Sequence, residues 1–302
     1  MQGRSKWQGA KACGPAVALV AAVVAGAAWH AAVAQDRPGA APASGLAGPG
    51  GFIVNPTRIV FEGGKRNAQL TVISQRDVPG TYRVSLVRMR MTEDGAIQEV
   101  AEPLADEQFA DTLVRFSPRQ AELQPRVPLT IRLQVRLPAG LPAGEYRSHL
   151  VVRAVPPPRE AVEDSAAPVT GVRIQITPAY GVAIPVIVRQ GATEATVSLA
   201  GLELRGPGPA DPRQRLALEL QRAGNRSVYG NLAVTLVPKS GRPLVVGRAN
   251  GVAVYTPNAL RRLEVPLDLL AGAPLAGGRL DVTFAEPGSR HAAPATASLP
   301  LP

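Results

Sequence analysis

The sequence predicts an all-β protein that consists of two β-sandwich domains in tandem, after an N-terminal export segment. Apolar and polar residues alternate with a period of two in most of the chain, which indicates strands with one buried and one solvated face. Turn residues separate these segments at intervals of roughly eight to twelve residues, a spacing typical of antiparallel sandwiches. The 302 residues are enough for two cores of ordinary size.

The N-terminus has the features of a secretion signal. Arg4, Lys6 and Lys11 precede an Ala- and Val-rich run without charge, and Ala32-Val33-Ala34 forms a small-x-small cleavage site. We therefore expect cleavage after Ala34 and a periplasmic product. The alternative is an uncleaved membrane anchor, because the run approaches the ~20 residues that a membrane span needs.

Removal of residues 1–34 also removes Cys13, the single cysteine. We therefore expect a mature chain that forms no disulfide and depends on core packing. It remains basic, but its arginines alternate along strands instead of clustering, so we expect no nucleic-acid partner.

Four parts of the chain are predicted: a signal peptide at 1–34, a flexible leader at 35–50, a first domain at 51–188 and a second at 189–302. The leader is rich in Gly, Pro and Ala and has no periodicity. The boundary between the domains falls at Arg189-Gln190-Gly191.

In the first domain, residues 129–137 form the clearest strand, with Leu, Ile and Val at alternate positions. Residues 82–91 also alternate, but the phase slips by one residue near Val87. Such a slip turns the opposite face inward, which indicates a bulge or a strand that changes sheets. Thr92-Glu93-Asp94-Gly95 then predicts a turn.

The second domain shows the same alternation. Strands are predicted around residues 216–220, 232–236, 263–269 and 280–284. Residues 201–212, which contain several Gly and Pro, are predicted to form a surface loop.

Catalytic and metal-binding chemistry has little support. After signal removal the histidines are His149 and His291, and we expect both to be surface residues, because no nucleophile or partner stands beside them in a usable geometry. The sequence has no metal-ligand spacing and no phosphate-binding glycine motif. We therefore expect no enzyme activity and no cofactor.

Several motifs in order resemble one family. They are Asn55-Pro56-Thr57-Arg58-Ile59-Val60-Phe61, Phe116-Ser117-Pro118-Arg119, Leu123-Gln124-Pro125 and Leu141-Pro142-Ala143-Gly144-Glu145-Tyr146-Arg147-Ser148-His149-Leu150. Residues 51–190 are similar in this respect to the periplasmic pilus-assembly chaperones of the chaperone-usher pathway. The resemblance implies two immunoglobulin-like domains, and it implies that Arg58 grips the C-terminal carboxylate of a pilus subunit.

The family's second carboxylate anchor is a lysine that lies a few residues before an arginine at the domain boundary. When that arginine is aligned with Arg189, Pro185 occupies the position of the lysine. A proline side chain cannot bind a carboxylate. Three alternatives follow: Arg58 works alone, Arg173 or Arg189 assists it, or the terminus is held differently.

A row of alternating apolar residues, Val172, Ile174 and Ile176, continues with Tyr180 and follows a Pro-rich connection, 156–168, that cannot fold alone. The row fits a donor strand that completes an unfinished subunit, as the resemblance implies, or an ordinary core strand. The long connection and Pro178 favour the donor strand.

The resemblance therefore predicts a chaperone that binds and caps fimbrial subunits and delivers them to an outer-membrane usher. It meets the membrane only during export. A structural subunit or adhesin-like surface protein of the same fold is the alternative. A subunit would need its own alternating apolar extension near the mature N-terminus, and residues 35–50 show none.

Overall fold

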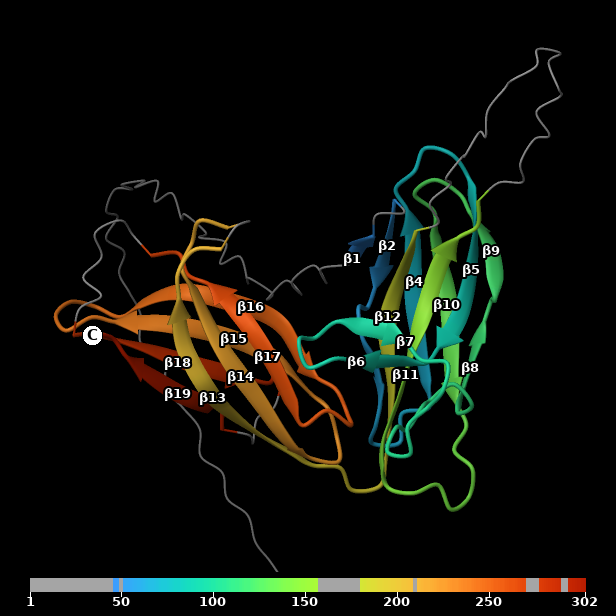
Figure 1. Cartoon of the computed structure of the whole chain (residues 1–302). Coiled ribbons are helices and arrows are strands. Elements are labelled where there is room, and N and C mark those ends of the chain that lie inside the picture. Colours follow the sequence, from blue (N-terminus) through green and yellow to red (C-terminus); the bar gives the residue numbers. More distant parts are fainter. Residues whose placement is uncertain (1–45, 49–50, 157–179, 209–210, 270–276, 289–292) are drawn as a thin grey trace, which may run out of the picture. The chain divides into compact units, whose positions relative to one another are not determined.

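The computed structural model describes residues 46–48, 51–156, 180–208, 211–269, 277–288 and 293–302 (Figure 1). These residues form nineteen strands and no helix, so the prediction of an all-β chain is confirmed in this part of the protein. Within the same residues no helix is long and apolar enough to cross a membrane. The predicted signal peptide, residues 1–34, lies outside the described residues.

Two five-stranded sheets form the first sandwich. One has the order β1 (Leu46–Gly48), β2 (Phe52–Asn55), β4 (Asn67–Ser74), β10 (Pro128–Val135) and β8 (Val114–Ser117). The other has the order β3 (Ile59–Phe61), β12 (Gly181–Gln190), β11 (Gly144–Ala154), β5 (Gly80–Val87) and β9 (Gln120–Leu123). All neighbouring strands are antiparallel except β3 and β12, which pair in parallel.

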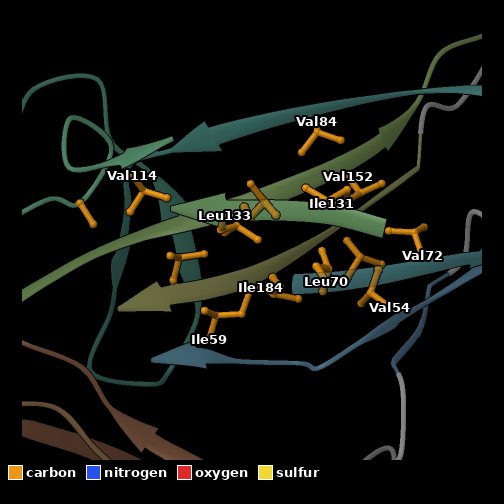
Figure 2. Close-up of a cluster of buried hydrophobic side chains, with 14 of the residues drawn as sticks. Val54, Ile59, Leu70, Val72, Val84, Val114, Ile131, Leu133, Val152 and Ile184 are labelled. Atoms are coloured by element: carbon orange, nitrogen blue, oxygen red, sulfur yellow. The ribbon is translucent and has the colours of Figure 1, made fainter. Parts of the chain in front are cut away.

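The core of this sandwich follows from the alternation. In β10, Ile131, Leu133 and Val135 are buried while the intervening residues are exposed, and β4 contributes Leu70 and Val72 in the same way. Figure 2 shows these side chains converging between the two sheets. Burial of this apolar surface is the main source of the domain's stability.

The slip of phase near Val87 marks a change of sheet, which is one of the two predicted alternatives. β5 ends at Val87, and the next strand, β6 (Met89–Met91), leaves the sandwich and pairs with β7 (Ile97–Glu99) in a separate hairpin. The predicted turn closes that hairpin: Gly95 donates its backbone N–H to the carbonyl of Thr92 at 2.9 Å and has a φ of 89°.

The second sandwich has a sheet of three strands and a sheet of four strands. The first contains β13 (Ala195–Arg205), β14 (Arg215–Gly224) and β17 (Leu260–Pro266), and the second contains β16 (Leu244–Val254), β15 (Val228–Val237), β18 (Arg279–Ala285) and β19 (Ala295–Pro300). Leucine and valine side chains of both sheets form its core together with Phe284. The four strands predicted in this domain correspond to β14, β15, β17 and β18.

The structure differs from the predictions in two segments. Residues 201–205, expected to start a loop, continue β13: Gly201 has a φ of 60° and lies in a bulge, after which the strand resumes pairing with β14. Leu202 and Leu204 pack against the core, which explains why the strand continues. In the expected flexible leader, Leu46–Gly48 pairs with β2.

Gly230 in β15 provides a test of this packing. A Cβ at this position would lie 2.5 Å from the carbonyl oxygen of Ala285 and 2.6 Å from the ring of Phe284. Gly230→Ala is expected to lower the free energy of unfolding by about 1–3 kcal/mol, because the backbone of β18 must shift. The measurement is urea denaturation.

Gly206→Ala is the matched control, because a Cβ there meets no atom within 4 Å. Its effect should stay within about 0.5 kcal/mol. Equal stability of the two variants would mean that β15 and β18 are not packed as described.

Candidate functional site

Arg58 lies where the chain crosses from one sheet of the first sandwich to the other. β2 ends at Asn55 in one sheet, and β3 begins at Ile59 in the other. Arg58 therefore directly precedes β3. Pairing of Ile59 with Val186 fixes the start of β3 against β12, so the backbone of Arg58 has a defined position.

The guanidinium of Arg58 contacts two tyrosines of the second sandwich. Its carbon atom lies 4.7 Å from the ring centroid of Tyr229 and 5.5 Å from that of Tyr255, and Nη1 donates a 3.3 Å hydrogen bond to the Tyr255 hydroxyl. Such stacking contributes about 0.5–1 kcal/mol at an exposed site. Among the described residues no carboxylate forms an ion pair with Arg58.

The outward face of β11 adds two more basic residues to the same place. Arg147 and His149 alternate with residues that point toward the core, yet they are 4% and 3% exposed. They are buried because Tyr255 packs on this face: the guanidinium carbon of Arg147 lies 4.4 Å from the centroid of its ring, and His149 meets the ring edge-on at 6.3 Å. Arg58, Arg147 and His149 around Tyr255 are called the basic cluster below.

Arg147 has few partners in this environment. Nη2 lies 3.4 Å from the carbonyl oxygen of Thr256, while Nε and Nη1 are buried without a hydrogen-bond partner in the described structure. Burial lowers the pKa of Arg147 from its ordinary value. A guanidinium nevertheless stays protonated in proteins, so Arg147 is a buried and poorly paired positive charge.

The prediction that His149 is a surface residue is wrong. Burial, followed by the charges of Arg147 and Arg58, lowers the pKa of His149 from 6.5 to about 3. The imidazole is therefore neutral at physiological pH, and its Nδ1 has no partner in the described part of the chain. His291 lies outside the described residues.

A buried carboxylate beside the cluster has its own partners. Glu145 is 2% exposed and accepts hydrogen bonds from the backbone N–H of Ser227 at 3.1 Å, from the Ser227 hydroxyl, and from Nε of Arg189 at 3.1 Å. The remaining nitrogens of Arg189 donate to Glu62 at 2.7 Å and to the carbonyl oxygen of Ser227 at 3.3 Å. Arg189 thus connects the two sandwiches, and each of its three side-chain nitrogens has a hydrogen-bond partner.

Hydrogen bonds on either side of Tyr255 in the sequence fix its position. The Ser227 hydroxyl accepts a 3.0 Å hydrogen bond from the backbone N–H of Thr256, and Nδ2 of Asn258 donates at 2.8 Å to the carbonyl oxygen of Met91 in β6. Met91, Ile187, Ala253 and Tyr255 form a small buried apolar cluster. The tyrosine is therefore held between the hairpin, β12 and its own sheet.

Part of one edge of β12, beside the basic cluster, pairs with none of the described strands. All of β12 pairs with β11 on one side, but on the other side β3 covers only Val186, Ile187 and Val188. Among the described strands none pairs with the remaining edge of Gly181–Pro185. Pro185 has no N–H, and proline within a sheet is confined to such edges.

The other predicted site residues have different positions. Pro185 lies opposite His149 in the pairing of β11 with β12, two positions along β11 from Arg147. Tyr180 precedes β12 and is 45% exposed, whereas Val182 and Ile184, in the same alternating phase, are core residues. Arg173, Val172, Ile174 and Ile176 lie outside the described residues.

Sequence reasoning did not identify Arg147 and His149 as site residues. The sequence nevertheless contained one indication: Glu145, Arg147 and His149 occupy alternate positions, so that three polar side chains lie on one face of one strand. No group of residues suited to a metal ion occurs in the described part of the chain.

Comparison with known proteins gives remote structural likenesses. No family model and no curated protein sequence matches the chain. Similar solved structures include the CsuC–CsuE chaperone–tip adhesion subunit complex of archaic chaperone-usher pili from Acinetobacter baumannii, with 11% identity over 82% of this chain and 97% of that chain and a TM-score of 0.43. The CupB2 chaperone of Pseudomonas aeruginosa has 15% identity over 83% and 100%, with a TM-score of 0.40.

The complex of the SafA pilin with the SafB chaperone of Salmonella enterica has 17% identity over 82% of this chain and 96% of that chain, with a TM-score of 0.39. These identities and TM-scores are too low for the likenesses to carry an argument. The case for a function therefore rests on the contacts of this chain.

The low pKa of His149 predicts a pH dependence of stability. Between pH 6.5 and about 3 the unfolded chain binds a proton at this residue that the folded chain does not. Stability is therefore lost as the pH falls through this window, by at most about 1.4 kcal/mol per pH unit. His149→Gln removes the titrating group, so its stability should fall less steeply in urea denaturation between about pH 7 and pH 4. Parallel slopes for the two proteins would mean that His149 takes up its proton in the folded state.

Proposed function

We propose that this protein is a periplasmic chaperone of the chaperone-usher type. It binds a fibre subunit by holding the subunit's C-terminal carboxylate at Arg58 and by pairing the subunit's last strand with the edge of β12 at Gly181–Pro185. The contact that carries the proposal is the guanidinium of Arg58, which stacks on Tyr229 and Tyr255 next to that edge.

The electrostatics of the basic cluster favour an anion. Arg58 and Arg147 contact the same tyrosine ring, and no carboxylate among the described residues forms an ion pair with either. A carboxylate can accept charged hydrogen bonds from a guanidinium, each contributing about 1.5–3 kcal/mol. A chain terminus supplies such a group at a fixed place in the backbone, so binding it would set the register of the strand that it ends.

The direction of the bound strand follows from the position of β3. β3 runs parallel to β12 and begins opposite Val186. The lane beside Gly181–Pro185, in which none of the described strands pairs, therefore leads directly to Arg58. A strand in this lane that runs parallel to β12 has its C-terminus next to Pro185 and Arg58. Backbone hydrogen bonds along the edge would supply affinity, as in other cases of strand addition.

The proposal also includes the predicted donor strand and the delivery of the bound subunit. Val172, Ile174 and Ile176 fill the subunit's open core, and Tyr180, which is exposed, extends the row. The chaperone then passes its client to an outer-membrane usher. Export through the signal at residues 1–34 would place both in the periplasm, and an intact mass that begins at Gln35 is the result expected from the exported protein.

Arg58→Ala tests the anchor. The variant is expected to fold normally, because Arg58 is only half buried, and to lose co-purification of a fibre subunit expressed in the same periplasm. The expected loss is tenfold or more in affinity, since one charged hydrogen bond contributes on the order of 1.5–3 kcal/mol. Thermal melting checks the fold, and recovery of the subunit with the tagged chain checks the function.

Arg132→Ala is the control, because Arg132 is exposed in β10 on the other sheet of the sandwich. It should retain the subunit at the level of the unchanged protein. If a stable Arg58→Ala variant retained the subunit fully, Arg58 would be a surface residue without a role in subunit binding.

A further inference from the structure

The buried guanidinium of Arg147 has no structural explanation within the described part of the protein. Nε and Nη1 are shielded from solvent and have no partner, and the single hydrogen bond from Nη2 is long, at 3.4 Å. An unsatisfied buried donor costs about 1–3 kcal/mol, and more when the group is charged. Arg147 therefore destabilises the free protein unless a ligand uses it.

The nearest acidic residues, Glu145 and Glu107, attract this charge from a distance, but neither forms an ion pair or a hydrogen bond with it. Glu145, two positions earlier on the same strand face, is already bound by Ser227 and Arg189. Glu107 forms two hydrogen bonds with Arg90, of 2.5 and 2.7 Å, and accepts a third from the backbone N–H of Leu104 at 2.8 Å. Both carboxylates therefore already have their own partners.

Arg147 and Arg58 also raise each other's electrostatic energy. Both guanidinium groups contact Tyr255, and the charge of Arg58 contributes to lowering the pKa of Arg147. Two positive charges this close in a poorly hydrated site repel each other. An anion bound between them would remove that repulsion and give the unpartnered donors an acceptor.

We propose that Arg147 is the second ligand of the subunit's C-terminal carboxylate and works as a pair with Arg58. This inference rests on the proposed function and identifies a residue for the role that Pro185 cannot fill. Arg147 is the inner group and Arg58, which is half buried, the outer group. The proposal requires the Arg58 side chain to move away from Tyr255 so that the carboxylate can reach both guanidinium groups. His149, whose Nδ1 has no partner among the described residues, lies on the same strand face.

Arg189 does not fit this role. Its Nε, Nη1 and Nη2 already donate to Glu145, Glu62 and Ser227. A client carboxylate at Arg189 would have to displace contacts that join the two sandwiches, whereas at Arg147 it displaces only the long bond to Thr256.

The proposal predicts effects of opposite sign on stability and on binding. Arg147→Met keeps an unbranched side chain of similar length and removes the charge. The free variant should melt at the same temperature as the unchanged protein or higher, because a buried unpaired charge has been replaced by an apolar group. Its preference for a carboxylate ligand should fall. A merely structural arginine would show the reverse, with lower stability and unchanged preference.

The binding probe is a pair of synthetic peptides of about ten residues with alternating Val and Thr, a length and pattern suited to one added strand. One peptide ends in a free carboxylate and the other in an amide. The unchanged protein is expected to bind the carboxylate peptide about tenfold or more tightly, by isothermal titration, and Arg147→Met should reduce that ratio by about tenfold.

Arg153→Met is the matched control, because Arg153 lies on the same strand face as Arg147 but is exposed. It should keep both the melting temperature and the carboxylate-to-amide ratio.

A carboxylate-to-amide affinity ratio that falls in Arg58→Ala but not in Arg147→Met would contradict this inference, while the proposed function would remain supported. An Arg147→Met variant that is destabilised but keeps the carboxylate-to-amide affinity ratio of the unchanged protein would also contradict it. Equal affinity of the unchanged protein for the two peptides, including no binding of either, would overturn the carboxylate anchor and this inference together.

Discussion

The hydrogen bonds of the buried Glu145 carboxylate are the contacts on which the rest of the site depends. This group, on the first sandwich, accepts hydrogen bonds from the backbone and hydroxyl of Ser227 on the second and from Arg189 at the boundary. The Ser227 hydroxyl in turn holds the backbone of Thr256, and so positions the neighbouring Tyr255. Breaking a buried pair of this kind by removing one partner costs about 3–5 kcal/mol. A fixed Tyr255 is the condition for placing Arg58 and Arg147 against one ring.

The basic cluster shows a conflict between stability and binding. Glu145 is hydrogen-bonded to partners of its own, so no acid in the described structure forms an ion pair with Arg58 or Arg147. Burial also lowers the pKa of His149 to about 3. The buried and poorly paired charge of Arg147 destabilises the free chain, and the charges of Arg147 and Arg58 favour a bound anion, whereas the neutral His149 adds no charge. Binding and catalytic sites often contain buried groups that lack partners and lower the stability of the free protein. The cluster therefore has the properties of a ligand site more than of a folding element.

The sequence predicted most of the sandwich strands because alternation directly reports which side chains face a core. It also proposed Arg58 as a site residue, through the motif around it. It did not identify Arg147 or His149, because alternation says only that they point away from the first core, and such a face is normally solvated. Their burial depends on Tyr255, more than a hundred residues later in the chain. The sequence does not predict the extension of β13 through Gly201, because glycine commonly indicates a loop, whereas here it occupies a bulge at a φ of 60°.

The most direct test of this account is a crystal structure of the chain with a fibre subunit co-purified from the periplasm. The account predicts that the subunit's last strand lies parallel to β12 beside Gly181–Pro185, and that its terminal carboxylate is within hydrogen-bonding distance of Arg58 and Arg147. Arg58 should then have left its present contact with the Tyr255 hydroxyl. A subunit bound elsewhere, or bound along β12 with its terminus in solvent and the basic cluster unchanged, would contradict the central claim.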